Sequence, residues 1–278
     1  MHSFYVEKPL DGVAALPPEE AKHAAKVLRL RPGDAVCAMD GAGKRWRGEI
    51  DAISNSAVTV RLVEALPSNE APARVTVYEG LPKADKLDFI AQKLTELGAA
   101  ALVPVRMERC VVRLDGKDAA KRRERLDRIA REAAKQCGRG LPMAVADATD
   151  WREALSAMAK HDALLIPWED ARGTRMKDVF AELPGALDIG IVVGPEGGMT
   201  PEEVAAMAQI GGRTVTLGPR ILRTETAAVV SAAQAQDVQG NFFFGRAGWR
   251  RREARRKNAI SPRDQTTPDE QTAAQRKM

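Results

Sequence analysis

From Arg74 onward the sequence alternates short apolar runs with longer amphipathic segments, and this alternation limits the fold more than any other feature. The runs RVTVYEG at 74–80 and IGIVV at 189–193 have the apolar, β-branched character of strands that are buried on both faces. Segments with helical periodicity separate such runs, as KADKLDFIAQKLTELG does at 83–98. The pattern predicts an α/β domain in which helices cover a mostly parallel sheet.

Residues 1–70 follow a different pattern, in which strand-like segments succeed one another. The segments KRWRGEID at 44–51 and AVTVRLVEAL at 57–66 alternate in polarity around the turn ISNS, which is typical of a β-hairpin. GDAVCAMD at 33–40 predicts a further strand. We therefore expect a small β-rich domain over 1–70.

The segment PSNEAPA at 67–73 interrupts the periodic pattern with proline and small polar residues, so we expect a linker there and a second domain over 74–243. The net charge of +5 lies beyond both domains. Residues 246–278 contain ten lysines and arginines against four acidic residues, a charge of +6, which leaves −1 on residues 1–245. This composition predicts a basic, disordered tail that either binds a polyanion such as RNA or only improves solubility.

Several classes of protein are disfavoured by composition. No apolar run is long enough to cross a bilayer, and the amino terminus does not have the pattern of a signal peptide, so we expect a cytoplasmic protein without a membrane segment. The few cysteines and histidines lack metal-ligand spacing, so no metal site is expected; they are Cys37, Cys110, Cys137, His2, His23 and His161.

Two strand-loop-helix junctions near the carboxyl end are the candidate ligand site. In the first, the strand at 189–193 is followed by GPEGG at 194–198 and then by MTPEEV, where Thr200 is a suitable N-cap and Glu203 completes a capping box. In the second, the strand RTVTLG leads through PRILR at 219–223 into TETAAVVSAAQAQDV. Loops at the carboxyl ends of parallel strands line the ligand crevice of open sheets.

Neither loop has the glycine and lysine spacing that cradles phosphates. Glycine allows the backbone to approach a ligand closely, so these loops suit a nucleoside-like ligand such as S-adenosylmethionine. The second junction also sets Arg223 and Glu225 between two apolar runs. These two side chains are the candidate catalytic residues.

The segments VVGPEGGMTPEE at 192–203 and LGPRILRTETA at 217–227 together resemble the signature of the SPOUT methyltransferases. The most similar family methylates N3 of a uridine in 16S ribosomal RNA. The resemblance extends over about residues 1–243: HAAKVLRLRPGD resembles that family's PUA-like, RNA-binding β-barrel, and KADKLDFIAQKLTELG, PVRMER and EAAKQCGRGLP resemble further blocks of it.

The resemblance implies a trefoil-knotted catalytic domain with a parallel sheet, a homodimer, S-adenosylmethionine as the methyl donor, and 16S ribosomal RNA within the small ribosomal subunit as the substrate. The donor-binding residues that it implies are Gly194, Pro195, Glu196, Gly197, Gly198, Leu217, Gly218, Ile221, Leu222 and Thr226. The RNA-binding residues that we expect are Lys83, Lys93, Arg106, Arg109, Gln136 and Arg139. Gln136 and Arg139 lie beside a glycine-marked helix end in KQCGRGLP, where side chains can reach a ligand.

Methylation at N3 gives Arg223 and Glu225 possible roles. The N–H proton must be removed, and the charge that spreads to the uracil oxygens must be stabilised. We expect Arg223 to stabilise that charge and Glu225 either to orient Arg223 or to accept the proton. Three alternatives remain open: a SPOUT ribose 2′-O-methyltransferase, a ribosome-assembly RNA binder without catalysis, and a purely helix-capping role for these two residues.

Overall fold

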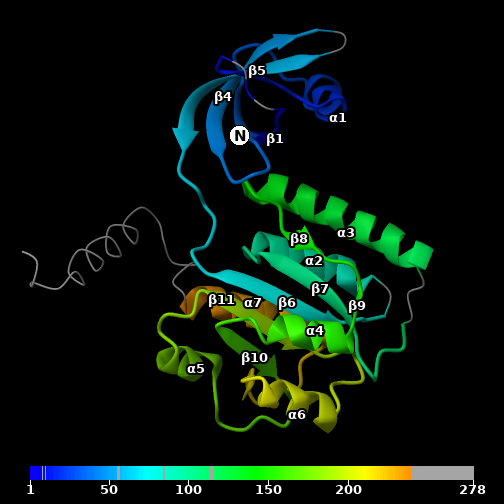
Figure 1. The fold of residues 1–278 in the computed structure, drawn as a ribbon. Coiled ribbons are helices and arrows are strands. Elements are labelled where there is room, and N and C mark those ends of the chain that lie inside the picture. The colour runs from blue at the N-terminus through cyan, green and yellow to red at the C-terminus, as the bar shows by residue number, and fades with distance from the viewer. Residues whose placement is uncertain (8, 10, 55–56, 84, 113–115, 239–278) are drawn as a thin grey trace, which may run out of the picture. The chain divides into compact units, whose positions relative to one another are not determined.

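The computed structural model of the chain describes residues 1–7, 9, 11–54, 57–83, 85–112 and 116–238. The predicted basic tail at 246–278 lies outside these residues. Within the described residues the strands form two separate sheets, one from residues 2–66 and the other from residues 74–215 (Figure 1). The change of pattern near residue 70 therefore coincides with the change from one sheet to the other.

The amino-terminal sheet has five strands among the described residues, in the order β1-β3-β4-β5-β2. The predicted hairpin is present, since β4 and β5 pair antiparallel along their length. Buried side chains such as Phe4, Val36, Ile50 and Val60 form the core of this sheet. The strands are β1 (His2–Tyr5), β2 (Val13–Ala15), β3 (Ala35–Met39), β4 (Arg45–Ile53) and β5 (Val58–Leu66).

The amphipathic pattern of EEAKHAAKVLRL at 19–30 indicates a short helix, and the helix observed there ends earlier. It consists of α1 (Pro18–Lys22), which continues directly into the π-helical stretch η1 (His23–Val27). Ala21 and Ala24 are its buried residues, so small side chains make its contact with the sheet. Strands β1 and β2, which flank this region, were not predicted.

The second sheet is parallel throughout the described residues, as the sequence predicted, with the order β12-β10-β11-β6-β7-β8 and with β9 paired to β7. Strand β6 is central and β10 separates β11 from β12, so the two predicted ligand loops follow strands that are not neighbours. The strands are β6 (Arg74–Gly80), β7 (Ala101–Arg106), β8 (Ala144–Val145), β9 (Thr149–Asp150), β10 (Ala163–Pro167), β11 (Asp188–Val193) and β12 (Arg213–Val215).

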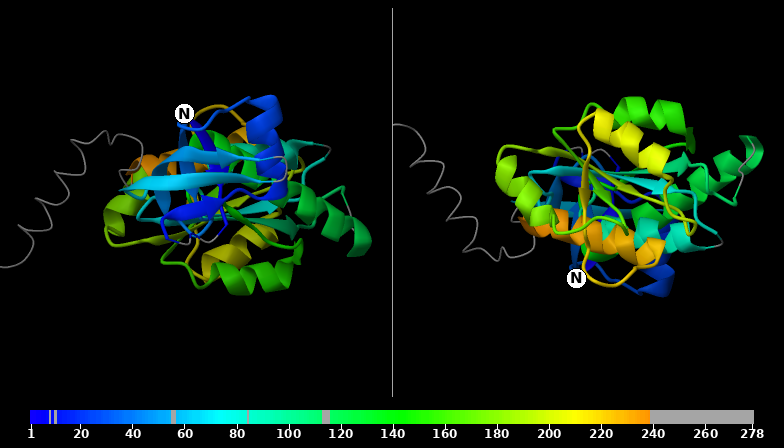
Figure 2. Two further views of the ribbon diagram at one scale, coloured as in Figure 1. Left: turned by 90° about the horizontal axis from the view of Figure 1, so that it is seen from above. Right: turned by 90° about the horizontal axis from the view of Figure 1, so that it is seen from below.

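Helices cover both faces of the parallel sheet (Figure 2). Helices α2, α3, α5 and α7 pack on one face through a core that includes Ile90, Leu126, Phe180 and Ala232, whereas α4 and α6 pack on the other through Met158 and Met207. Alternate residues of the strands supply the two cores. The helices are α2 (Lys86–Glu96), α3 (Gly116–Cys137), α4 (Trp151–Met158), α5 (Met176–Glu182), α6 (Pro201–Gln209) and α7 (Thr224–Val238).

Candidate functional site

The first ligand loop, residues 194–198, connects β11 to α6. The predicted capping box is confirmed: Glu203 N–H donates to Thr200 Oγ1 at 3.1 Å, and Thr200 N–H donates to Glu203 Oε2 at 2.9 Å. The loop itself is a tight turn, in which Gly198 N–H donates to the Pro195 carbonyl at 2.8 Å. The helix start therefore fixes one end of the loop by local hydrogen bonds.

Two glycines of this loop are required by its geometry. Gly198 has a φ of +72°, a conformation that favours glycine. At Gly194, an added Cβ atom would lie 2.9 Å from Met199 Cγ and 3.1 Å from the Gly198 carbonyl carbon. A side chain at either position would strain the turn, so the backbone of the loop remains open to close approach by a ligand.

The second loop, residues 216–223, connects β12 to α7. Gly218 has a φ of +116°, and its N–H donates to Thr216 Oγ1 at 3.2 Å. At the start of α7, Thr224 Oγ1 donates to the Gly194 carbonyl at 2.7 Å. This bond joins the two loops across the carboxyl edge of the sheet.

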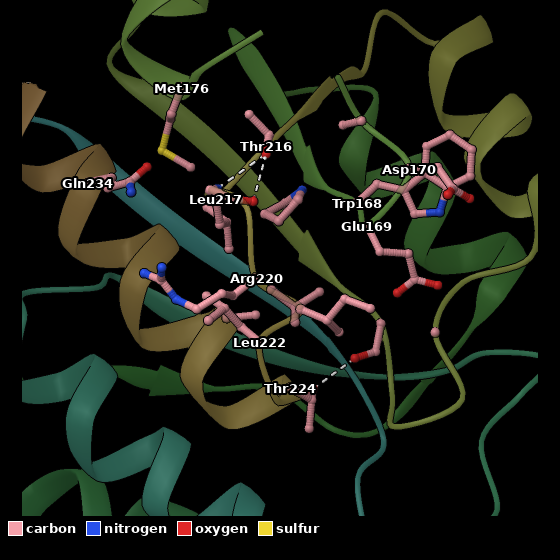
Figure 3. Close-up of a pocket in the computed structure, with 18 of the residues that line it drawn as sticks. Trp168, Glu169, Asp170, Met176, Thr216, Leu217, Arg220, Leu222, Thr224 and Gln234 are labelled. Carbon is pink, nitrogen blue, oxygen red and sulfur yellow. Dashed lines mark hydrogen bonds between the residues drawn. The ribbon is translucent and has the colours of Figure 1, made fainter. Parts of the chain in front are cut away.

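A cavity of about 1580 Å³ lies between the two loops (Figure 3). Arg223 lines it together with most of the predicted donor-binding residues. Gly197 and Thr226 do not line it, and Glu225 also lies outside the lining. The predicted residues that line the cavity are Gly194, Pro195, Glu196, Gly198, Leu217, Gly218, Ile221 and Leu222.

Thr224 takes the place in the cavity that we expected for Thr226. Thr224 is buried, lines the cavity and bonds to the first loop, whereas Thr226 is exposed. The helical repeat explains the difference, because Thr224 shares the buried face of α7 with Ala228 and Ala232. Reading the positions i, i+4 and i+8 of the sequence as one face identifies Thr224 as the threonine that lines the cavity.

The loop after β10 also contributes to the cavity, which the sequence did not predict. Trp168 and Glu169 line it on one side, and Met176 and Gln234 lie across from them (Figure 3). The only signal in the sequence was the position of Trp168, immediately after the apolar run DALLIP at 162–167, which indicates a strand of the parallel sheet. The same rule that selected the other two loops applies to it.

Glu225 is paired with Lys86 of α2, and not with Arg223. Lys86 Nζ lies 3.2 Å from Glu225 Oε2 and 3.0 Å from Glu196 Oε1, so one ammonium group contacts the first loop and α7 together. Arg223 makes no ion pair with any described residue and is exposed at the cavity. The expectation that Glu225 orients Arg223 is therefore wrong, and the Arg223 guanidinium stays available to a substrate.

The charges around Lys86 reinforce one another. The hydrogen bond to Glu196 is the main reason that the pKa of Lys86 is raised. Burial alone would raise the pKa of Glu196, but the hydrogen bonds from Lys86 and from backbone N–H groups outweigh it, so that pKa is lowered. Lys83 N–H supplies one of those bonds, at 3.0 Å from Glu196 Oε1. Glu196 is therefore held as a carboxylate.

The predicted RNA-binding residues have different local surroundings, although Lys93 and Gln136 line one pocket between α2 and α3. Arg109 lies at the first loop, where its guanidinium donates to the Gly197 carbonyl at 3.0 Å. Lys93 pairs with Glu96 at 2.8 Å, and Arg106 pairs with Asp150 at 3.1 Å. Lys83 and Gln136 are exposed.

Arg139 has a structural position, which corrects its assignment to RNA binding. Its side chain is 6% exposed, and its guanidinium contacts Glu70 at 2.6 Å and donates to the carbonyls of Thr95 and Ala99 at 2.8 and 3.1 Å. The adjacent backbone is also hydrogen-bonded, since the Asn69 side-chain amide donates to the Gly138 carbonyl at 3.0 Å. Arg139 therefore fixes the segment between the two sheets to the end of α3 and does not face a ligand.

No group of three or more His, Cys, Asp and Glu side chains among the described residues is arranged to hold a metal ion. None of the described helices is both long enough and apolar enough to cross a membrane.

Comparison with known families and relatives places the two sheets in different family domains. Residues 69–236 match the family described as the RNA methyltransferase domain, and residues 16–63 match the RNA methyltransferase PUA domain. Among curated relatives, ribosomal RNA small subunit methyltransferase E of Bacillus subtilis is 38% identical over 75% of this chain and 84% of its own length. The Mycobacterium bovis protein of the same name is 34% identical over 82% of this chain and 88% of its own length.

Solved structures with a similar fold include two that were crystallised with the methyl donor. Ribosomal RNA small subunit methyltransferase E from Neisseria gonorrhoeae, bound to S-adenosyl methionine, is 33% identical, has a TM-score of 0.77, and the match covers 87% of this chain and 99% of that chain. A putative methyltransferase from Legionella pneumophila, in complex with the same cofactor, is 28% identical with a TM-score of 0.74 over 84% and 96%.

Proposed function

This chain belongs to the ribosomal RNA small subunit methyltransferase E family, and we propose that it transfers the methyl group of S-adenosylmethionine to N3 of a uridine in 16S ribosomal RNA. One observation carries the proposal. The loops that follow β11 and β12 close around one cavity with Arg223 exposed in it, in a chain that is similar along most of its length to a relative crystallised with that donor.

The methyl donor occupies the cavity between the loops. Its adenosine and methionine parts contact the backbone of residues 194–198 and 217–222, where glycines leave the N–H and C=O groups accessible. Lys86 holds Glu196 in place, and Thr224 holds the Gly194 carbonyl. The donor site is therefore fixed from α2, β11 and α7 at once.

The transfer step needs a negative charge to be stabilised. The electron pair at N3 of the uracil forms the new bond to the methyl carbon, and the sulfonium sulfur takes the electrons of the broken S–C bond and becomes a neutral thioether. We assign the N3 proton to the Glu225 carboxylate, which lies outside the cavity lining but whose partner Lys86 lines the cavity. Arg223 has no carboxylate partner among the described residues, so its guanidinium stabilises the charge that develops on the uracil oxygens.

The finer architecture follows from the family. Residues 74–243 form a trefoil-knotted domain, residues 1–70 close into a PUA-like barrel that contacts RNA, and residues 246–278 are a basic tail. Two copies associate as a homodimer that acts in the cytoplasm on the small ribosomal subunit. Support comes from the PUA family match at 16–63 and from the parallel sheet order. Light scattering in solution tests the dimer directly.

The test of the proposed function is the chemical identity of the product. Purified protein, S-adenosylmethionine and either 16S ribosomal RNA or small subunits from a strain that lacks the enzyme are incubated, and the RNA is digested and analysed by nucleoside mass spectrometry. We expect N3-methyluridine. A ribose-methylated nucleoside would refute the assignment to N3, and donor binding without any methylated product from either substrate would identify a binding protein.

A further inference from the structure

Glu79 is an acidic residue buried in the centre of the parallel sheet. It lies at the carboxyl end of β6, paired in register with Val193 of β11 and Pro104 of β7, and it is 0% exposed. The next residue, Gly80, packs directly on the first loop, because a Cβ atom there would lie 2.5 Å from Pro195 Cδ. Glu79 is therefore enclosed beneath the loop that is proposed to bind the donor.

Thr224 connects Glu79 to both loops. Its Oγ1 atom lies 2.5 Å from Glu79 Oε1 and 2.7 Å from the Gly194 carbonyl oxygen. A hydroxyl group has one proton to donate, and a carbonyl oxygen has none. Both short contacts are hydrogen bonds at the same time only if Thr224 donates to Gly194 and Glu79 donates to Thr224.

The surroundings of Glu79 favour the same protonation state. Its Oε2 atom is buried and has no hydrogen-bond partner among the described residues, which is costly for an ionised carboxylate. Burial is the main cause that raises the pKa of Glu79 well above its ordinary value. Glu196 of the first loop and Glu225 of α7 raise it further, while Lys86 of α2 and the bond with Thr224 act in the opposite direction.

We propose that Glu79 is a positioning residue that, as a neutral carboxylic acid, donates a hydrogen bond to Thr224 and thereby fixes the Gly194 carbonyl and the start of α7 relative to each other. The link joins the two loops from beneath the cavity. It rests on the function proposed above only in that these loops hold the methyl donor. Glu79 contacts neither donor nor RNA, so it acts through Thr224.

Isotope-edited infrared spectroscopy tests the protonation state without any ligand. With carbon-13 in the glutamate carboxyl groups, the wild-type protein at neutral pH should show a band of a protonated carboxyl group that Glu79→Gln removes. A spectrum with only ionised carboxylates would overturn the proposal. The reading does not depend on donor binding, so it separates this proposal from the proposed function.

Variants test the link itself. Glu79→Gln keeps the shape and places an N–H donor against Thr224, so it should bind S-adenosylmethionine as the wild type does. Glu79→Leu removes the donor and should weaken that affinity roughly two- to tenfold, the effect expected of one hydrogen bond. Thr224→Val should weaken it similarly, and Thr224→Ser should not. Equal losses in Glu79→Gln and Glu79→Leu would show that Glu79 acts as a carboxylate, and equal affinity in all four variants would exclude a positioning role.

The pH dependence of the free energy of unfolding provides a further test, and this test does not require the Glu79→Leu variant to fold. Because the folded pKa is raised from its ordinary value of 4.5, the folded protein binds more protons than the unfolded chain above that pH. The free energy of unfolding of the wild type should therefore fall, relative to Glu79→Gln, as the pH rises from 4.5 towards the folded pKa. Parallel curves for the two proteins would contradict a protonated Glu79.

Discussion

Lys86 Nζ lies 3.2 Å from Glu225 Oε2. Glu225, which is two residues after Arg223 at the start of α7, is therefore held by a lysine of α2. The same ammonium group lies 3.0 Å from Glu196 Oε1 in the first loop. One cation thus neutralises carboxylates from two segments that meet only in the folded protein. The guanidinium of Arg223 is left without a competing carboxylate in the described chain.

Replacing Arg223 with alanine should lower turnover about a hundredfold to a thousandfold while changing donor affinity little, because the guanidinium acts on charge that develops during the reaction. Single-turnover rates and calorimetric donor affinities measure the two effects. Arg213→Ala is the control, since Arg213 begins β12 at the end of the strand opposite the loop and pairs with Glu182. Unchanged turnover per folded molecule would show that Arg223 has only a helix-capping role.

Replacing Glu225 with glutamine should slow methyl transfer about a hundredfold or more, because the amide cannot accept the N3 proton. Single-turnover rates at saturating S-adenosylmethionine measure the change. Glu202→Gln, an exposed change in α6, is the control. If the variant keeps the wild-type rate, another group accepts the proton.

Replacing Lys86 with methionine should weaken S-adenosylmethionine binding roughly fivefold, the effect of losing a partly exposed ion pair. Glu196 and Glu225 lose their shared partner, and their like charges then loosen the two loops. Calorimetry at low and high salt measures the change, which should be smaller at high salt. Lys160→Met, an exposed change after α4, should leave the affinity unaltered; identical affinities for the two variants would remove Lys86 from the donor site.

Replacing Arg139 with leucine should destabilise the protein by roughly 3 kcal/mol, because the partly buried Glu70 carboxylate and the carbonyls of Thr95 and Ala99 lose their donor. Chemical denaturation measures the change. The matched control is Arg47→Leu, which breaks an exposed pair with Glu64 and should cost less than about 1 kcal/mol. Weaker RNA binding by the folded Arg139 variant, with full stability, would return this residue to the RNA surface.

Removing residues 246–278 should weaken RNA binding and reduce its dependence on salt, and it should leave donor binding unchanged. These residues carry a charge of +6. Each contact with a phosphate contributes roughly 0.9 to the slope of log affinity against log salt on duplex nucleic acid, and roughly 0.7 on single strands. The slope is measured by titration at several salt concentrations. Equal slopes for the full and shortened chains would make the tail a solubilising segment.

The parallel sheet and the two loops were predictable because they depend on local rules. A β-branched run indicates a buried strand, and Thr200 with Glu203 three residues later indicates a helix start. The rule for open sheets then placed both loops at the same edge. None of these steps requires knowledge of a contact between distant segments.

The contacts that complete the site were not predictable in this way. Lys86, Glu79 and Thr224 reach it from three separate elements, and a single sequence carries no signal for which partner each one meets. The same limit explains the error at Arg139, where a glycine-flanked helix end suggested a ligand contact. The partner that buries this arginine, Glu70, lies far away in the sequence.

The Glu203 carboxylate, which completes the capping box of α6, accepts a second hydrogen bond through its other oxygen. While Oε2 of Glu203 accepts from Thr200 N–H, Oε1 accepts from Glu108 N–H at 2.9 Å, in the segment that follows β7. The two amides therefore share one carboxylate although they belong to different segments. In hydrogen–deuterium exchange they should lose protection together, with matching rates, each time the first turn of α6 opens. Exchange at the Glu108 amide should therefore report the opening of the first turn of α6, next to the first loop.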